Sequence, residues 1–110
     1  MFFSGSILAE PCDQDENKKF VFEKNSTLRT SFEYYAKQEG WQLVWEFPGD
    51  LPLLATSTLR GEFACDTGVA YQVVKGVGSV ADFGYMNISF DSVNTVIHIT
   101  SSPKKLIGEG

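Results

Sequence analysis

The sequence has few cations, few cysteines and no long hydrophobic run. Only 9 Lys and Arg, scattered along the chain, stand against 14 Asp and Glu, which gives a formal net charge of -5. Nucleic-acid binding requires clustered Lys and Arg that displace counterions from phosphates, so this balance argues against a nucleic-acid partner. No segment approaches the roughly 20 consecutive apolar residues that cross a bilayer. We therefore expect contact with a membrane only indirectly, through partners or through an upstream anchor.

The chain is also poor in groups that carry catalysis or bind metals. Its one histidine, His98, alternates with Ile97 and Ile99, and we interpret it as a surface or interface residue rather than a general base. Two cysteines and one histidine match no zinc-ligand spacing. We therefore expect no enzymatic activity, no cofactor and no metal. A small hydrolase is the alternative from another class, although no nucleophile is assembled with a base.

The two cysteines, Cys12 and Cys65, leave the redox compartment open. One bridge in an oxidising compartment and two reduced thiols fit the count equally well. A bridge between them would close a long loop and contribute about 4 kcal/mol in the chain-entropy model.

What the chain has is enough apolar material for one domain. It is 110 residues long, 43% hydrophobic and 14% aromatic, so a single core can form without metals. Residues 1–19 combine a short apolar stub with a polar stretch and predict a flexible leader or a remnant of an upstream region. We expect one binding domain over residues 20–102 and a disordered tail over 103–110.

The first helix has the clearest local signals. Its apolar residues recur at helical spacing over residues 27–39, and Asn25 or Ser26 precedes them as an expected N-cap. Glu33 and Lys37 are spaced to form an i,i+4 ion pair.

The remaining periodicities predict an α+β fold. The predicted elements are, in order, strand 20–22, helix 27–39, strands 41–46 and 53–59, helix 62–75, and strands 85–90 and 95–100, the last two joined by a turn at 91–94. Gly68 lies inside the second helical pattern and weakens it. Gly76 and Gly78 are expected to end that helix. This order favours two helices packed on small mixed β-sheets.

The apolar positions of these elements define the expected core. It consists of Leu28, Phe32, Ala36, Trp41, Leu43, Trp45, Phe63, Ile88, Ile97 and Ile99. We expect Phe32, Trp41 and Trp45 to be largely buried between the first helix and the sheet.

The last predicted strand is the candidate docking edge. Its residues Val96, Ile97, His98 and Ile99 include no Lys, Glu or Pro, the residues that natural edge strands use against unwanted pairing. This absence indicates either an intended partner that adds a strand or a strand that another element already covers.

One stretch carries a family resemblance. The motif combines a helix end with an alternating strand, and its residues are Ala36, Gly40, Trp41, Leu43 and Trp45, followed by Asp50 and Leu53. With this motif, residues 20–101 resemble the carboxy-terminal domain of the toxin-coregulated pilus biosynthesis protein Q family. That domain is similar to the amino-terminal domain of secretins and to the signalling domain of some TonB-dependent receptors.

The resemblance implies a non-enzymatic interaction module in the periplasm of a Gram-negative bacterium, associated with the outer membrane. It implies a role in type IV pilus biogenesis, conjugation or secretion. The implied partner is an outer-membrane secretin or another pilus or secretion subunit. The alternative is a signal-relay domain that binds a transmembrane regulator, as the receptor signalling domains do. An exported location would favour the bridge between Cys12 and Cys65.

Overall fold

Two β-sheets enclose a pair of α-helices in the computed structural model, which describes residues 18–80 and 83–103. The elements are β1 (Lys19–Phe22), α1 (Leu28–Gln38), β2 (Gln42–Trp45), β3 (Ser57–Arg60), α2 (Val69–Val77), β4 (Ser79–Val80), β5 (Gly84–Asp91) and β6 (Val96–Ser102). The expected order of elements is confirmed, and β4 is an additional short strand. Most of the expected leader and tail, residues 1–17 and 104–110, lies outside the described residues.

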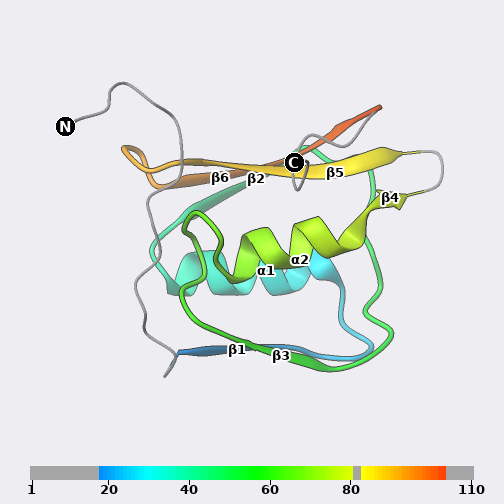
Figure 1. The fold of residues 1–110 in the computed structure, drawn as a ribbon, viewed down its shortest axis with the longest axis horizontal. Coiled ribbons are helices and arrows are strands. Elements are labelled where there is room, and N and C mark those ends of the chain that lie inside the picture. Colours follow the sequence, from blue (N-terminus) through cyan, green and yellow to red (C-terminus); the bar gives the residue numbers. More distant parts are fainter. Residues whose placement is uncertain (1–17, 81–82, 104–110) are drawn as a thin grey trace.

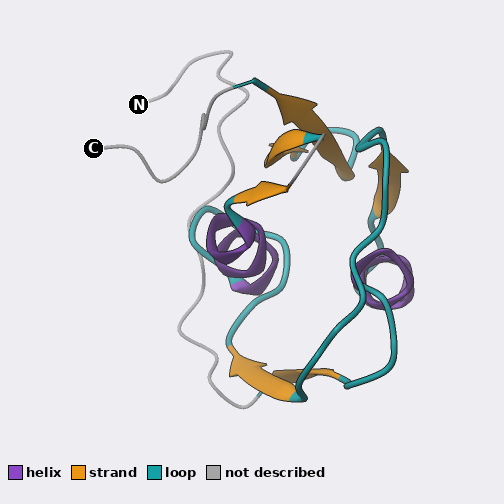
Figure 2. Cartoon of the chain, turned by 90° about the vertical axis from the view of Figure 1, so that its right-hand side faces the viewer, coloured by secondary structure: helices purple, strands orange, loops and turns teal. Residues whose placement is uncertain are grey.

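The elements form three layers (Figures 1 and 2). A four-stranded sheet in the order β2-β6-β5-β4 forms one outer layer, and the two-stranded sheet β1-β3 forms the other. Both helices lie between them. β2 runs parallel to β6, whereas the other pairs are antiparallel. The α+β class with small mixed sheets is therefore confirmed.

α1 begins at a threonine. The Thr27 side chain accepts a hydrogen bond from the backbone N–H of Thr30 at 3.2 Å, which satisfies one of the amides that a helix start leaves unpaired. The prediction of Asn25 or Ser26 as the cap is wrong, because Asn25 has a φ of 75° and belongs to the turn before the helix. Gly40 follows the helix with a φ of 82°, a conformation that glycine adopts without strain.

The ion pair on α1 also differs from the prediction. Glu33 pairs with Arg29, whose Nε lies 3.0 Å from the carboxylate, and not with Lys37. The Arg29 guanidinium lies 5.9 Å from the ring centre of Trp45. This cation–π contact holds Arg29 on the flank of α1 where it reaches Glu33.

α2 begins seven residues later than the predicted helix. The segment before it is a loop whose carbonyls accept the first helical amides: Val69 N–H donates to Glu62 at 2.8 Å, and Ala70 N–H donates to Phe63 at 3.0 Å. A Cβ on Gly68 would lie 2.5 Å from the Glu62 carbonyl oxygen, so only glycine allows this close return. The loop thus replaces the expected first turns of the helix.

The end of α2 is set by Gly78 alone. Gly76, which we expected to end the helix together with Gly78, lies inside α2. Gly78 follows with a φ of 71°, which breaks the helical path and leads directly into β4.

The hairpin of β5 and β6 contains the predicted turn. The Asp91 carboxylate accepts the backbone N–H groups of Val93 and Asn94 and the side-chain amide of Asn94. These hydrogen bonds lower the pKa of Asp91 below its ordinary value, and the one from the Asn94 side chain makes the largest contribution. The turn is therefore fixed by one aspartate whose carboxylate accepts hydrogen bonds from the two residues that follow at positions 93 and 94.

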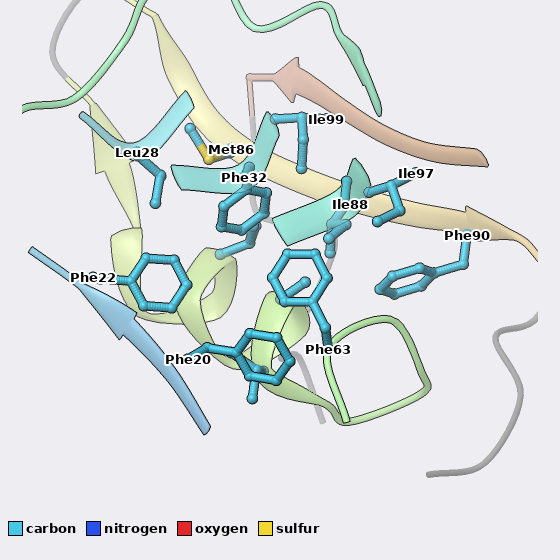
Figure 3. Close-up of a cluster of buried hydrophobic side chains, with 14 of the residues drawn as sticks. Phe20, Phe22, Leu28, Phe32, Phe63, Met86, Ile88, Phe90, Ile97 and Ile99 are labelled. Atoms are coloured by element: carbon cyan, nitrogen blue, oxygen red, sulfur yellow. The ribbon is translucent and has the colours of Figure 1, made fainter. Parts of the chain in front are cut away.

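The core lies between the four-stranded sheet, the helices and β1, and its side chains converge there (Figure 3). Of the expected core residues, Leu28, Phe32, Ala36, Phe63, Ile88, Ile97 and Ile99 are buried. Trp41, Leu43 and Trp45 are only partly buried and pack against the cluster from its rim, because β2 is an outer strand of its sheet. The sequence reading missed several members of the core, among them Phe20, Phe22, Phe47, Val69, Val74, Met86 and Phe90.

Candidate docking surfaces

The predicted docking edge lies in the interior of the sheet. β6 pairs with β2 on one side, where Leu43 is opposite Ile97. On the other side it pairs with β5, where Phe90 is opposite the same Ile97. The prediction that residues 96–99 form an open edge is therefore wrong, and its alternative, a strand covered by another element, is correct. β2 covers this side of β6 as a parallel strand, and parallel neighbours are joined by a long crossover connection. The local pattern of β6 does not reveal this pairing.

His98 lies on the outer face of the sheet, away from the helices. Its register partners are Ser89 on β5 and Val44 on β2, and its side chain is half-buried. No group of three or more His, Cys, Asp or Glu that could hold a metal occurs in residues 18–80 and 83–103. Within the same residues, no helix has the length and apolar character needed to cross a membrane.

The open edge of the sheet on this side is β2. Gln42 N–H donates to the Thr95 carbonyl at 2.9 Å, and Glu46 N–H donates to the Ile99 carbonyl at 2.7 Å. Alternate residues of a parallel strand bond the same neighbour, so the backbone groups of Leu43 and Trp45 point away from β6. Within the described part of the chain, β2 pairs with β6 only. The backbone donors and acceptors of these two residues are therefore available to another strand.

Side-chain contacts hold this edge in place. The indole N–H of Trp45 donates to the Gly49 carbonyl at 2.9 Å. Its ring packs edge-on against Phe32, with 6.4 Å between ring centres, while Arg29 covers it from α1. An edge fixed in this way loses little conformational freedom when a partner strand binds.

A second surface, the apolar groove, lies at the opposite edge of the same sheet. It has a volume of about 490 Å³ and is lined by Leu28, Leu51, Pro52, Leu53, Leu54, Val73, Val77, Ser79 and Val80. Leu28 is buried, whereas Leu54 is 82% exposed. Sequence reasoning missed this surface. The signal that could have found it is the run Leu51-Pro52-Leu53-Leu54, three leucines and a proline in a segment that forms neither helix nor strand.

The wall formed by residues 51–54 is fixed by α1. Its hydrogen bonds to the first residue of α1 and to the residues before the helix are Leu28 N–H to Leu51 carbonyl at 2.8 Å, Leu53 N–H to Ser26 carbonyl at 2.9 Å and Asn25 N–H to Leu53 carbonyl at 3.0 Å. The Asp50 carboxylate accepts the backbone N–H groups of Arg29 and Leu51 at 3.0 and 2.8 Å. Asp50 and Leu53, which belong to the motif found in the sequence, therefore hold this wall against the start of α1.

Of the two cysteines, the structure describes one. Cys65 is 2% exposed, and its Sγ lies 3.8 Å from the Glu62 carbonyl oxygen in the loop before α2. Cys12 lies outside the described residues, so the pairing of the two stays a prediction.

Comparison with known protein families gives a match that covers most of the chain. The model of the family described as toxin co-regulated pilus biosynthesis protein Q matches residues 18–102. Neither a curated protein nor a solved structure matches the chain.

Proposed function

The chain belongs to the toxin co-regulated pilus biosynthesis protein Q family, and we propose that it is a non-enzymatic docking module of the periplasm that binds an outer-membrane secretin. Membership makes it an envelope-associated protein of pilus biogenesis that acts with other envelope or pilus components. The finer statements, namely the secretin and the periplasm, rest on the resemblance of the motif around Trp41 and Trp45 to secretin-associated domains.

The observation that carries the docking proposal is the open edge of β2. Strand addition uses main-chain hydrogen bonds and requires no special set of side chains. β2 offers the outward N–H and carbonyl groups of Leu43 and Trp45, and its four residues include no Lys or Pro that would discourage pairing. β2 has only four residues, and natural sheets use short edge strands to prevent unintended pairing with other chains.

The cysteines support the exported location. No described cysteine is a free thiol, and Cys65 is buried next to the loop that precedes α2. A bridge from Cys12 to Cys65 is stable only in an oxidising compartment such as the periplasm. The proposal therefore includes this bridge as a tether for the residues that precede the domain.

The test compares two changes at one edge residue. Leu43→Pro removes the outward amide, whereas Leu43→Ala shortens the same side chain and keeps the amide. In a pull-down with the periplasmic domains of the secretin of the same system, we expect the alanine variant to bind and the proline variant to lose binding. Circular dichroism spectra of both variants are expected to match that of the wild type. Equal binding by the two variants would show that the edge of β2 is not the docking surface.

A third variant protects the test against misfolding of the proline variant. Val44→Lys places a gatekeeper charge on the outer face of β2 without changing any backbone amide. Thr100→Lys places the same charge on the outer face of β6, beyond the residues that pair with β2. We expect the first to weaken binding and the second to leave it unchanged.

A further inference from the structure

We propose that the Tyr35 hydroxyl closes the edge of β1 and so prevents two copies of the chain from pairing through that strand. β1 belongs to the two-stranded sheet, which is the layer opposite the sheet of β2. The closure is therefore separate from the edge of β2 and from any secretin. It is made by one side chain of α1 and can be removed without changing β1 itself.

β1 has an outer edge. Within the residues that the structure describes, its one strand neighbour is β3. Gly61 N–H donates to the Lys18 carbonyl at 2.9 Å, so this carbonyl is directed toward β3. Neighbouring residues of an antiparallel strand direct their backbone groups to opposite sides. Phe20 therefore also faces β3, whereas Lys19 and Val21 direct their N–H and carbonyl groups to the outer edge.

The Tyr35 hydroxyl bonds both outward groups of Val21. The Val21 N–H donates to the hydroxyl at 3.0 Å, and the hydroxyl donates to the Val21 carbonyl at 2.8 Å. A phenol is both a donor and an acceptor, so this one group replaces the donor and the acceptor that a neighbouring strand would supply. The ring contacts those of Phe20, Phe22 and Phe63, whose centres lie 4.9, 5.7 and 6.0 Å away. These contacts fix the hydroxyl at the edge.

The edge is accessible apart from this hydroxyl. A groove of about 310 Å³ lies between β1 and α1, and its lining includes Val21, Glu23, Thr30, Tyr34 and Tyr35. Tyr34 is 63% exposed. There is thus room for another chain beside β1, and the hydroxyl of Tyr35 separates the backbone of Val21 from that room.

The sequence of β1 and the residue after it is complementary to itself. In an antiparallel pair of two copies centred on Val21, Lys19 of each copy would lie opposite Glu23 of the other. Both side chains are exposed, and opposite charges at facing positions of two strands attract. Lys18 would lie opposite another lysine, but its Nζ already bonds the Glu39 carboxylate at 2.8 Å. These charges make a second copy the partner that an open edge of β1 would select.

The hydroxyl removes the gain from such pairing. In the wild type, each Val21 would exchange its two bonds to Tyr35 for two bonds to the other copy, and both hydroxyls would lose their partners. Hydrogen bonding then gains nothing, while association still costs translational and rotational freedom. Without Tyr35 at the edge, the Val21 groups bond only water. Pairing then gains the bonds between the strands and the contacts between Lys19 and Glu23.

Sedimentation equilibrium of the full chain tests this by measuring the dimer dissociation constant. Tyr35→Leu removes the hydroxyl and shortens the side chain, which then no longer reaches the edge. Tyr34→Leu is the matched control, because Tyr34 is the preceding residue of α1 and is 63% exposed. We expect Tyr35→Leu to dimerise at least tenfold more tightly than the wild type, and Tyr34→Leu to stay within twofold of it. Equal dissociation constants of the two variants would overturn the proposal.

Charge reversal identifies the surface of the dimer and excludes association through a loosened core. In the Tyr35→Leu background, Lys19→Glu or Glu23→Lys alone places like charges opposite each other. We expect either change to weaken the dimer at least tenfold, and both together to restore it to within about threefold of Tyr35→Leu. A dimer that none of these changes affects would overturn β1 as the pairing strand.

Hydrogen exchange tests the closure in a variant that keeps the packing of the ring. Tyr35→Phe retains the aromatic contacts and removes only the hydroxyl. We expect the amide proton of Val21 to exchange at least tenfold faster than in the wild type, and that of Phe20, which faces β3, to stay within twofold. Unchanged exchange at Val21 would overturn the role of the hydroxyl, whatever the result for Tyr35→Leu.

Discussion

The two helices lie side by side between the same two sheets, yet they begin in different ways. α1 begins at Thr27, whose own side chain bonds the first turn. α2 begins at Gly68, which makes no side-chain cap, and its first amides are bonded by carbonyls of a loop that folds back from residues 62 and 63. The start of α1 is therefore encoded locally, whereas the start of α2 depends on how a neighbouring loop is placed.

This difference also separates what the two helices contribute to function. The start of α1 and the residues before it bond Asp50 and Leu53 and so hold the wall formed by residues 51–54. The flank of α1 supports Trp45 at the edge of β2. α2 supplies Val73 and Val77 to the opposite side of the groove. Both candidate surfaces thus depend on α1, and one of them depends on α2 as well.

The largest expected effect is the loss of the aromatic side chain that anchors α1. Phe32 is fully buried and contacts the rings of Phe22, Phe63 and Trp45. Phe32→Ala should lower the free energy of unfolding by about 3 to 5 kcal/mol, as large-to-small changes in packed cores do. The urea midpoint measures this. Val74→Ala is the counterpart on α2, also buried, and should cost less because it removes less volume. An unchanged midpoint in Phe32→Ala would contradict the burial of this ring.

The second effect concerns the loop that begins α2. If Cys12 and Cys65 are bridged, breaking the bridge should lower the free energy of unfolding by about 2 to 4 kcal/mol. Urea unfolding with and without a reductant measures this difference, and in Cys12→Ser the reductant should have no effect. Intact mass after alkylation checks the bridge directly. Labelling of both thiols in periplasmic protein without prior reduction would show that no bridge exists.

The third effect compares two glycines near and within α2. A Cβ on Gly68 would lie 2.5 Å from both the Glu62 carbonyl oxygen and the Cys65 Sγ, whereas a Cβ on Gly76 would meet nothing within 4 Å. Gly68→Ala should therefore destabilise the protein by about 1 to 3 kcal/mol through crowding. Gly76→Ala should instead stabilise it by about 0.5 to 1 kcal/mol, because alanine is the better helix former. Thermal melting of both variants measures the signs, and shifts in the same direction would contradict the loop geometry.

The contrast between a locally encoded start of α1 and a start of α2 that depends on a neighbouring loop also explains how far the sequence predicts the fold. The alternation of apolar residues and the turn at Asp91 are local, and the order of elements and the hairpin of β5 and β6 follow from them. The start of α2 does not follow from a local pattern. Phe63 has the spacing of a helical residue but lies in the loop before α2, and the path of that loop is set by the close contacts at Gly68. β4 has only two residues and no pattern that periodicity can detect.

The candidate surfaces were harder to predict for a related reason. The absence of Lys, Glu and Pro in residues 96–99 fits both an open edge and a central strand, and only the parallel pairing of β2 decides between them. The groove combines residues from segments that are far apart in the sequence, such as Leu54 and Val77. No local pattern records that these segments lie together.

The smallest expected effect tests the local start of α1 directly. The Thr27 hydroxyl accepts the Thr30 N–H at 3.2 Å and also lies 3.0 Å from the Thr30 hydroxyl. Thr27→Ala leaves that amide without a protein acceptor and should lower the free energy of unfolding by about 1 kcal/mol, whereas Thr27→Ser keeps the hydroxyl and should cost only a few tenths. Urea unfolding of the two variants gives both values. Because α2 has no side-chain cap at the corresponding position, its start should respond to changes in the loop and not to a cap. Equal stabilities of the alanine and serine variants would mean that the start of α1, like that of α2, is determined by contacts with neighbouring segments and not by a side-chain cap.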